Sequence, residues 1–322
     1  SLGTRLAGFN GAESEMVIAP SGDLPAVGGA ALHQLLLNQQ RVVGETTGMA
    51  DALAPYRFAA RAASEGRFGL PSDGPQSPLA MLGPQVSMDA DRYGEMLKSR
   101  CVDRCDVTSA TIAGVDRGEG GRLASAVLAD GTRVDGDFFV DMSGALSRLA
   151  GFEDTSCPSP TASFDRPAFW SDPTDGIEMP TYRADRNGVL KSTPVSGGTL
   201  HCYLGIMGGD ENGVASTIPE DAQVATAPSA PVQAPWIANF VRLGNGAGSP
   251  GPLLAAHDAM LQALTLHLAD LLPARAGMKA EAYAFNSRYR ETLAGISDFA
   301  NAPIHLAARS GLLWTGASEA TP

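Results

Sequence analysis

The segment Asp130–Arg148, with the sequence DGTRVDGDFFVDMSGALSR, restricts the fold of this chain more than any other stretch. Its Asp130-Gly131 pair lies between two alternating runs and predicts a β-hairpin turn. The apolar run Phe138–Asp141 ends at an acid and predicts a buried strand, which a small Ser143-Gly144 turn follows. Such a turn presents backbone N–H groups at the carboxyl end of a sheet, where open α/β folds bind their ligands. A structural turn without a ligand is the alternative.

The preceding stretch, Pro84–Arg100, predicts a short strand followed by an amphipathic helix. An aspartate stands at the start of this helix, and Tyr93, Met96 and Leu97 lie on one helical face. The predicted order from Gln85 to Arg148 is therefore strand, helix, hairpin, strand and glycine-containing turn.

This order resembles the flavin-dependent tryptophan halogenases, which are relatives of the FAD monooxygenases. Met88–Leu97 (MDADRYGEML) is similar to the family's LDAxRYxxFL segment, and Gly136–Gly144 (GDFFVDMSG) is similar to its GDLFIDCSGFR-like strand and turn. The resemblance implies an α/β fold. It consists of a Rossmann-like FAD-binding domain of the glutathione-reductase and p-hydroxybenzoate-hydroxylase type, an inserted β-sheet substrate domain and C-terminal helices. It also implies FAD as cofactor, supplied in reduced form by a separate flavin reductase, and a small aromatic substrate.

The resemblance also divides the chain into regions. Residues 1–54, 84–149 and 236–275 are expected to form the FAD-binding domain, residues 55–83 and 150–235 the β-rich substrate domain, and residues 276–322 a shortened helical region. The family's G-x-G-x-x-G unit, which binds pyrophosphate at a helix N-terminus, would precede Ser1. We therefore expect Ser1–Gly8 to be the second half of that helix, followed by a turn and the strand Met16–Ala19.

Three turns are expected to contact FAD. One lies in the loop Asp23–Ala31, which resembles the family's IPTVGVGEAT loop, and one is the turn after Phe138–Asp141. The third lies in Trp236–Gly248, which resembles the family's WxGNCVALGLSAG segment. For each, a plain glycine-rich turn is the alternative. The expected contact residues are Gly28, Gly29, Ser143, Gly144, Gly244, Gly246 and Gly248.

The positions that match the family's chemical groups are substituted. Arg57 stands where the family has the lysine that contacts hypochlorous acid, and it is the candidate catalytic residue, with a surface or ion-paired arginine as the alternative. Leu254 stands for the catalytic glutamate and Ala255 for the serine beside it. Leucine can neither accept a proton nor stabilise a positive charge. Val189–Pro194 replaces the WxWxIP motif without either tryptophan, and no acid follows the strand Met16–Ala19 to bind the adenosine ribose.

The remaining periodic stretches predict further elements. Met49–Arg67 predicts a helix and a strand. Strands are expected at Gly188–Pro194 and Thr199–Met207, with Gly197-Gly198 as the turn between them. Two helices follow, at Leu253–Leu272 and Met278–Ala294.

Composition excludes several classes of partner. The formal net charge is −12 and no basic run is present, which argues against nucleic acid. No apolar run approaches the roughly 20 residues that span a bilayer, so no membrane span is expected. Cys101 and Cys105 lie four residues apart, but no His or Cys is spaced to complete a metal site, so we expect reduced thiols and no metal. A cytoplasmic location is the corresponding expectation.

Two functional hypotheses remain. In the first, the chain is a flavin-dependent enzyme related to the tryptophan halogenases that does not halogenate by the usual lysine and glutamate mechanism. In the second, it is a non-catalytic pseudoenzyme that uses the fold to bind a small molecule or a protein. An unrelated α/β protein with accidental similarity is the third interpretation.

Overall fold

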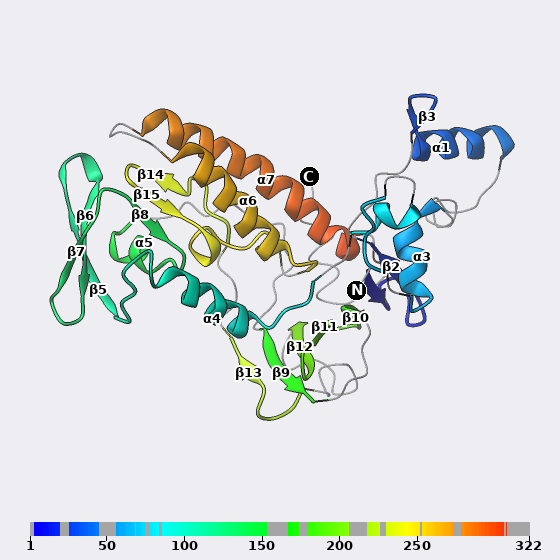
Figure 1. The fold of residues 1–322 in the computed structure, drawn as a ribbon, viewed down its shortest axis with the longest axis horizontal. Helices are drawn as coiled ribbons and strands as arrows, with labels where there is room; N and C mark the ends of the chain where they lie inside the picture. Colours follow the sequence, from blue (N-terminus) through cyan, green and yellow to red (C-terminus); the bar gives the residue numbers. More distant parts are fainter. Residues whose placement is uncertain are drawn as a thin grey trace. The chain divides into compact units, whose positions relative to one another are not determined.

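The structure is a computed structural model, and it describes residues 3–19, 26–44, 56–67, 69–74, 77–83, 86–152, 167–173, 179–205, 218–225, 230–251, 253–272, 278–305 and 307. These residues form two compact units, each of which is described by itself (Figure 1). The first unit comprises the described parts of Ser1–Arg100 and Asp165–Ala225. The second comprises those of Cys101–Phe164 and Thr226–Ala307. The predicted division into FAD-binding, substrate and helical regions stays a prediction.

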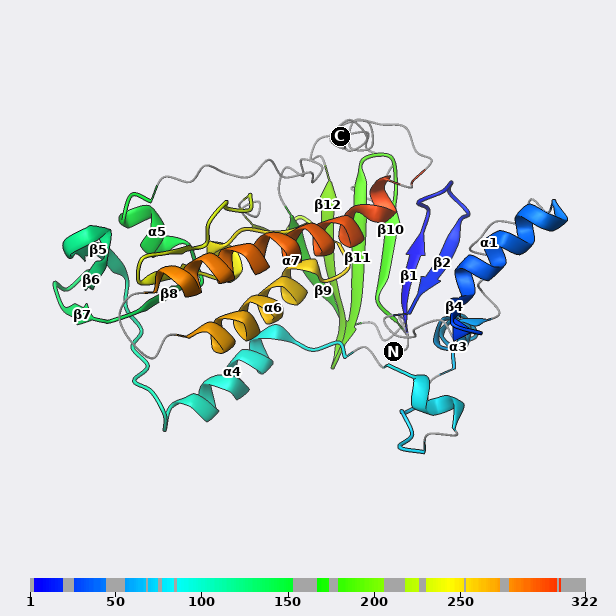
Figure 2. The same cartoon turned by 90° about the horizontal axis from the view of Figure 1, so that it is seen from above.

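A seven-stranded mixed sheet forms the centre of the first unit, and Figure 2 shows its strands side by side. All neighbours are antiparallel except β1 and β10, which run parallel. In spatial order the strands are β13 (Gln223–Val224), β9 (Ala168–Asp172), β12 (Gly198–Gly205), β11 (Gly188–Val195), β10 (Thr181–Ala184), β1 (Thr4–Ala7) and β2 (Glu15–Ile18).

The first strand corrects the sequence prediction for Ser1–Gly8. Residues Thr4–Ala7 form β1 and no part of a helix among the described residues. The reason is an alternation with a period of two, in which Thr4 and Leu6 are buried while Arg5 and Ala7 are half-buried. Pairing with β2 on one side and β10 on the other satisfies the backbone of the strand. The prediction of β2 is confirmed.

The predicted hairpin of β11 and β12 is present, with its loop one residue earlier than expected. Val195 pairs with Gly198, so Ser196 and Gly197 form the loop. This register places Ser192 opposite His201, whose Nδ1 lies 2.9 Å from the Ser192 Oγ. The His201 Nε2 is 3.3 Å from an Asp172 carboxylate oxygen on β9. Because Ser192 is buried, we infer that these three side chains stabilise the pairing of β11, β12 and β9.

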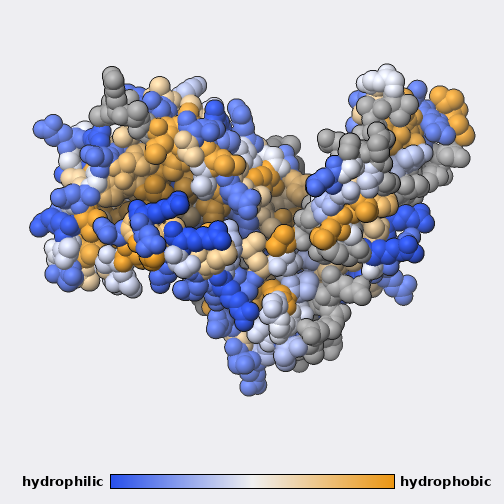
Figure 3. All heavy atoms as spheres, viewed as in Figure 1, coloured by the Kyte–Doolittle hydropathy of each residue, from blue (hydrophilic) through white to orange (hydrophobic). Residues whose placement is uncertain are grey.

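Short elements follow β2 in the sequence. The hairpin β3 (Ala26–Val27) and β4 (Ala30–Ala31) leads into α1 (Leu32–Val43), which ends at Gly44 in the left-handed conformation. Several of its apolar side chains face solvent, and Figure 3 shows hydrophobic surface on this helix.

Residues Phe58–Ser64 form the helix α3, although a strand was predicted toward the end of Met49–Arg67. The segment FAARAAS contains four alanines, which have the highest helix propensity, and this explains the difference. The first residues of the predicted stretch, 49–55, lie outside the described residues. The 3-10 helix η2 (Pro78–Met81) follows in the sequence.

The helix predicted in Pro84–Arg100 is α4 (Ala90–Cys101). Its start is capped as expected, because an Asp89 carboxylate oxygen accepts hydrogen bonds from the backbone N–H groups of Asp91 and Arg92. The strand expected before it is absent from the described residues 86–89. The apolar residues of the predicted face are all exposed.

The second unit contains two small sheets. One is the antiparallel sheet of β5 (Ile112–Arg117), β6 (Leu123–Leu128) and β7 (Arg133–Asp135), with the 3-10 helix η3 (Glu119–Gly121) between its first two strands. The predicted Asp130-Gly131 turn joins β6 to β7 and is confirmed. Across this sheet, hydrogen bonds from Arg133 and Ser125 hold the pKa of the Asp116 carboxyl below its usual range.

The other sheet consists of β14 (Trp236–Ile237), β15 (Phe240–Arg242) and β8 (Phe139–Asp141). The helices α6 (Ala256–Leu271) and α7 (Lys279–His305) pack against one another beside it (Figure 1). Helix α7 continues well past the predicted end at Ala294. Trp236 lies between the rings of Phe138 and Phe285 in the core of this unit. In the described part of the chain, no helix is both long and apolar enough to cross a membrane.

The cysteines give a test of the burial pattern. Cys101 and Cys105 are exposed, whereas burial in the sheet raises the pKa of the Cys202 thiol to about 11. Because the thiolate is the reactive form, iodoacetamide at neutral pH should alkylate Cys202 at least ~10-fold more slowly than the other two. Peptide mass spectrometry measures the rates, with the urea-unfolded chain as control. Equal rates in the folded protein would contradict this placement.

Candidate functional site

Two turns lie side by side at one edge of the second unit because the strands that precede them run parallel. Strand β8 pairs with β15, with Phe139 opposite Phe240 and Asp141 opposite Arg242. Each strand ends there, and each is followed by a glycine-containing turn. This edge is the one at which open α/β sheets bind ligands.

The carboxylate of Asp141 shapes the first turn. It is buried, and its Oδ1 accepts hydrogen bonds from the backbone N–H groups of Ser143 (3.1 Å) and Gly144 (2.8 Å) and from the Ser143 hydroxyl (3.1 Å). Its Oδ2 accepts the backbone N–H of Ser147 (3.0 Å). Asp141 thereby caps α5 (Ala145–Leu149), whose N-cap residue, Gly144, has no side chain to do so.

The second turn rests on the first through backbone contacts. The N–H of Leu243 donates to the Asp141 carbonyl (3.0 Å), and that of Gly246, in the 3-10 helix η5 (Gly244–Gly246), donates to the Met142 carbonyl (3.2 Å). A Cβ at Gly246 would lie 2.6 Å from the Asp141 carbonyl oxygen, so only glycine allows this approach. The predicted residues Gly144 and Gly246 are therefore neighbours.

The other predicted cofactor residues differ in their surroundings. Gly248, at φ +89°, packs against the backbone of Ala230, so its lack of a side chain serves the chain's own packing. Gly28 and Gly29 belong to the first unit, where they form the exposed turn between β3 and β4. A shared ligand for all three turns stays a prediction.

Arg57, the candidate catalytic residue, is half-buried and directly precedes α3 in the first unit. Its carbonyl accepts the backbone N–H of Arg61 and so begins the helix. Whether Arg57 takes part in chemistry stays a prediction.

The N–H donors of the paired turns are already used within the chain. The N–H group of Gly144 donates to the Asp141 carboxylate, and that of Gly246 donates to backbone carbonyl groups. Gly246 is also buried, whereas Gly144 is half-buried. Of these two glycines, only Gly144 is open to contact with a ligand.

A strained turn was not predicted from the sequence. Leu254 and Ala255, just before α6, have φ values of +54° and +55°. A left-handed conformation in residues other than glycine costs on the order of 1–3 kcal/mol each and is typical of functional sites. The strain is supported by Leu253, whose side chain is fully buried. Neither residue is Gly or Asn, so no local pattern predicts this conformation.

No cluster of three or more His, Cys, Asp or Glu side chains able to hold a metal ion occurs within the described ranges. The candidate site therefore consists of the paired turns after β8 and β15 and the strained turn before α6.

Comparison with known proteins places these features in context. The sequence model of a family described as Tryptophan halogenase matches residues 11–157 and 217–321, which together exceed half of the chain. No curated protein sequence matches.

Solved structures share the fold. The flavin-dependent halogenase BrvH from Brevundimonas sp. BAL3 superposes with a TM-score of 0.86 at 20% identity, covering 100% of this chain and 68% of that one. For a flavin-dependent halogenase from Xanthomonas campestris the TM-score is 0.78 at 20% identity, covering 99% and 66%. For the tryptophan 6-halogenase SttH from Streptomyces toxytricini it is 0.79 at 17%, covering 100% and 68%. The chain thus spans about two thirds of these relatives, and the predicted fold class is confirmed.

The hydrogen bonds of Asp141 give a stability prediction. Asp141→Asn keeps the volume but replaces one acceptor oxygen by an amide group that faces N–H donors, so unfolding free energy should fall by about 2–4 kcal/mol. Urea unfolding followed by tryptophan fluorescence measures the change. The matched control is Asp137→Asn, an exposed aspartate of the same segment, which should change stability by less than about 0.5 kcal/mol. Equal effects of the two substitutions would contradict the role of Asp141.

Proposed function

The chain belongs to the tryptophan halogenase family, and on that premise we propose that it binds FAD and acts on a small aromatic compound without the family's lysine and glutamate mechanism. The observation that carries this proposal is the turn at Leu254 and Ala255. Its backbone keeps a strained, positive-φ conformation at the positions that match the catalytic glutamate and serine, while neither side chain can hold or transfer a proton.

The groups that would act on a substrate follow from these substitutions. FAD, delivered in reduced form by a separate reductase, would supply the chemistry that activates molecular oxygen. Gly144 would contact the ring through its backbone, since its N–H group is occupied and Gly246 is buried. Arg57 would hold an anion through its permanent charge, but arginine does not release a proton at working pH. Leu254 would line the substrate pocket, and it would not remove a proton from the substrate.

A second candidate is a non-catalytic binding role. It is favoured by the same hydrogen bonds, because N–H groups that the chain has already used cannot bind the cofactor's phosphates. The two candidates differ in whether flavin binds, and this difference is measurable.

The first test is a titration of the protein, expressed from its complete reading frame, with FAD and with reduced FAD under anaerobic conditions. Saturable binding in either redox state, followed by visible absorbance and flavin fluorescence, is expected. Asp141→Asn should weaken it, because the paired turns would shift. If neither form binds, the enzyme proposal fails and the binding role replaces it.

The second test concerns the chemistry. With reduced FAD, oxygen and bromide, the protein should yield no brominated tryptophan or indole by mass spectrometry. The double substitution Arg57→Lys and Leu254→Glu should raise the bromination rate to at least ~100-fold above that of the unmodified protein. One positioned proton acceptor contributes a rate factor of about this size. Leu254→Gln is the matched control, since glutamine has the shape of glutamate but accepts no proton. Bromination by the unmodified protein would contradict the proposal.

A further inference from the structure

A cavity of about 290 Å³ opens in the first unit beside α3, and the site described above does not use it. Small-molecule pockets begin at roughly this size, near 300 Å³. Since a water molecule occupies about 30 Å³ in the liquid, the cavity has room for a single-ring compound and too little for a nucleotide. The lining residues that the structure describes all belong to the segment 58–82 of one unit.

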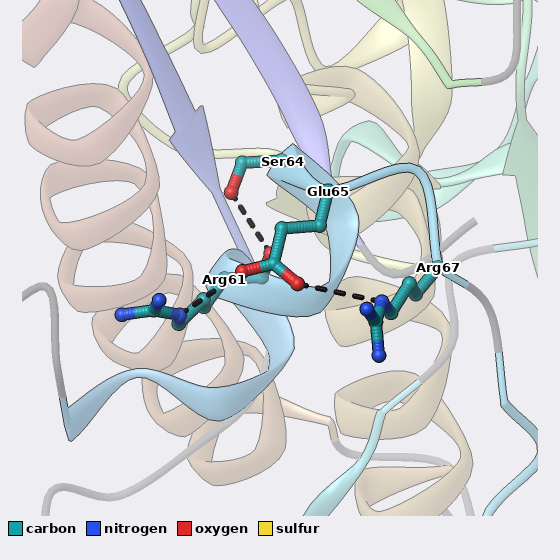
Figure 4. Close-up of polar contacts among 4 residues, drawn as sticks. All are labelled: Arg61, Ser64, Glu65 and Arg67. Atoms are coloured by element: carbon teal, nitrogen blue, oxygen red, sulfur yellow. Dashed lines mark hydrogen bonds and ion pairs between the residues drawn. The ribbon is translucent and has the colours of Figure 1, made fainter.

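Three charged side chains lie together in the wall of the cavity. The Nε of Arg61 is 3.1 Å from one carboxylate oxygen of Glu65, and the Nε of Arg67 is 3.4 Å from the other. Figure 4 shows the Glu65 carboxylate between the two guanidinium groups, with a contact drawn to each Nε and none to the terminal nitrogens. Within the described ranges these terminal nitrogens have no further partner. In each guanidinium group the N–H donors on the two terminal nitrogens are therefore available to a second acceptor.

The rest of the wall is apolar. Phe58 and Leu79 line the cavity with 44% and 39% of their surface exposed, and Leu82 is buried beneath them. Large apolar side chains left open beside a cavity favour the burial of another apolar surface. The cavity thus combines an apolar wall with paired cationic groups.

The charges decide which ligand fits. Among the lining residues that the structure describes, two arginines and one glutamate give one net positive charge, in a chain whose formal net charge is −12. The ion pairs are exposed, and such pairs contribute little to stability, so a ligand can replace them at low cost. Arginine binds carboxylates through two parallel hydrogen bonds. An anion is therefore preferred over a neutral or cationic ligand.

We infer that this cavity binds a small carboxylate with a single aromatic ring or a short aliphatic body. The ring lies against Phe58 and Leu79, and the carboxylate takes the place of the Glu65 carboxylate between Arg61 and Arg67. Without a ligand Glu65 occupies this place, so it competes with the ligand for both guanidinium groups. This site does not depend on flavin binding.

Isothermal titration calorimetry of the full chain with benzoate, benzamide and benzylamine tests the inference. Benzoate should bind with a Kd of about 1 mM or lower, and the neutral and cationic probes should bind at least roughly fivefold more weakly. Arg61→Gln and Arg67→Gln should each weaken benzoate about fivefold. Glu65→Gln should strengthen it about threefold, because the competing carboxylate is gone.

Arg92→Gln is the matched control, since Arg92 is an exposed arginine on α4 that pairs with Asp89 and lies outside the cavity. It should leave benzoate affinity unchanged. The sign for Glu65→Gln separates the site from simple loss of folding, because an unfolded variant cannot gain affinity. No saturable binding of benzoate below about 20 mM, a preference for benzylamine, or a loss of affinity in Glu65→Gln would each overturn the inference.

Discussion

The buried carboxylate of Asp141 is the interaction on which the second unit depends. Its two oxygens accept hydrogen bonds from the turn that follows and from the first turn of α5, and its backbone carbonyl accepts Leu243 from the neighbouring strand end. A buried charge is costly unless it is fully hydrogen-bonded, and here the backbone N–H groups supply those bonds. The same bonds consume the donors that a ligand would otherwise use. These N–H groups are therefore not available to a ligand.

Side chains far away in the sequence hold these turns in place. The Asn239 amide bonds the backbone of Leu123 in both directions, at 2.9 Å and 2.8 Å, and so joins β6 to the β14–β15 turn. Tyr289 of α7 donates its hydroxyl to the Ala247 carbonyl (3.0 Å), and Ser297 donates to that of Pro250 (2.9 Å). Binding residues are commonly carried by loops on such a rigid frame. The frame of the family is present here.

The proposed change of chemistry concerns one turn of the second unit. The strained turn before α6 has a conformation that costs free energy, and Leu254 and Ala255 offer no proton acceptor. In the first unit, Arg57 precedes an alanine-rich helix beside a cavity with its own pair of arginines, Arg61 and Arg67. A family fold with altered chemistry and a separate anion site is consistent with both features.

Local patterns determined much of this protein. The Asp130-Gly131 hairpin, the strand ending at Asp141 and the helix cap at Asp89 were predictable because each depends on neighbours in the sequence. Other features depended on distant partners. Residues Thr4–Ala7 form a strand because β2 and β10 pair with it, and Gly144 meets Gly246 because β8 and β15 run parallel. The positive φ of Leu254 also has no local signal, since leucine does not favour this conformation, and it lies beside the fully buried Leu253. Tertiary contacts decided these features because no short segment contains the partner that stabilises them.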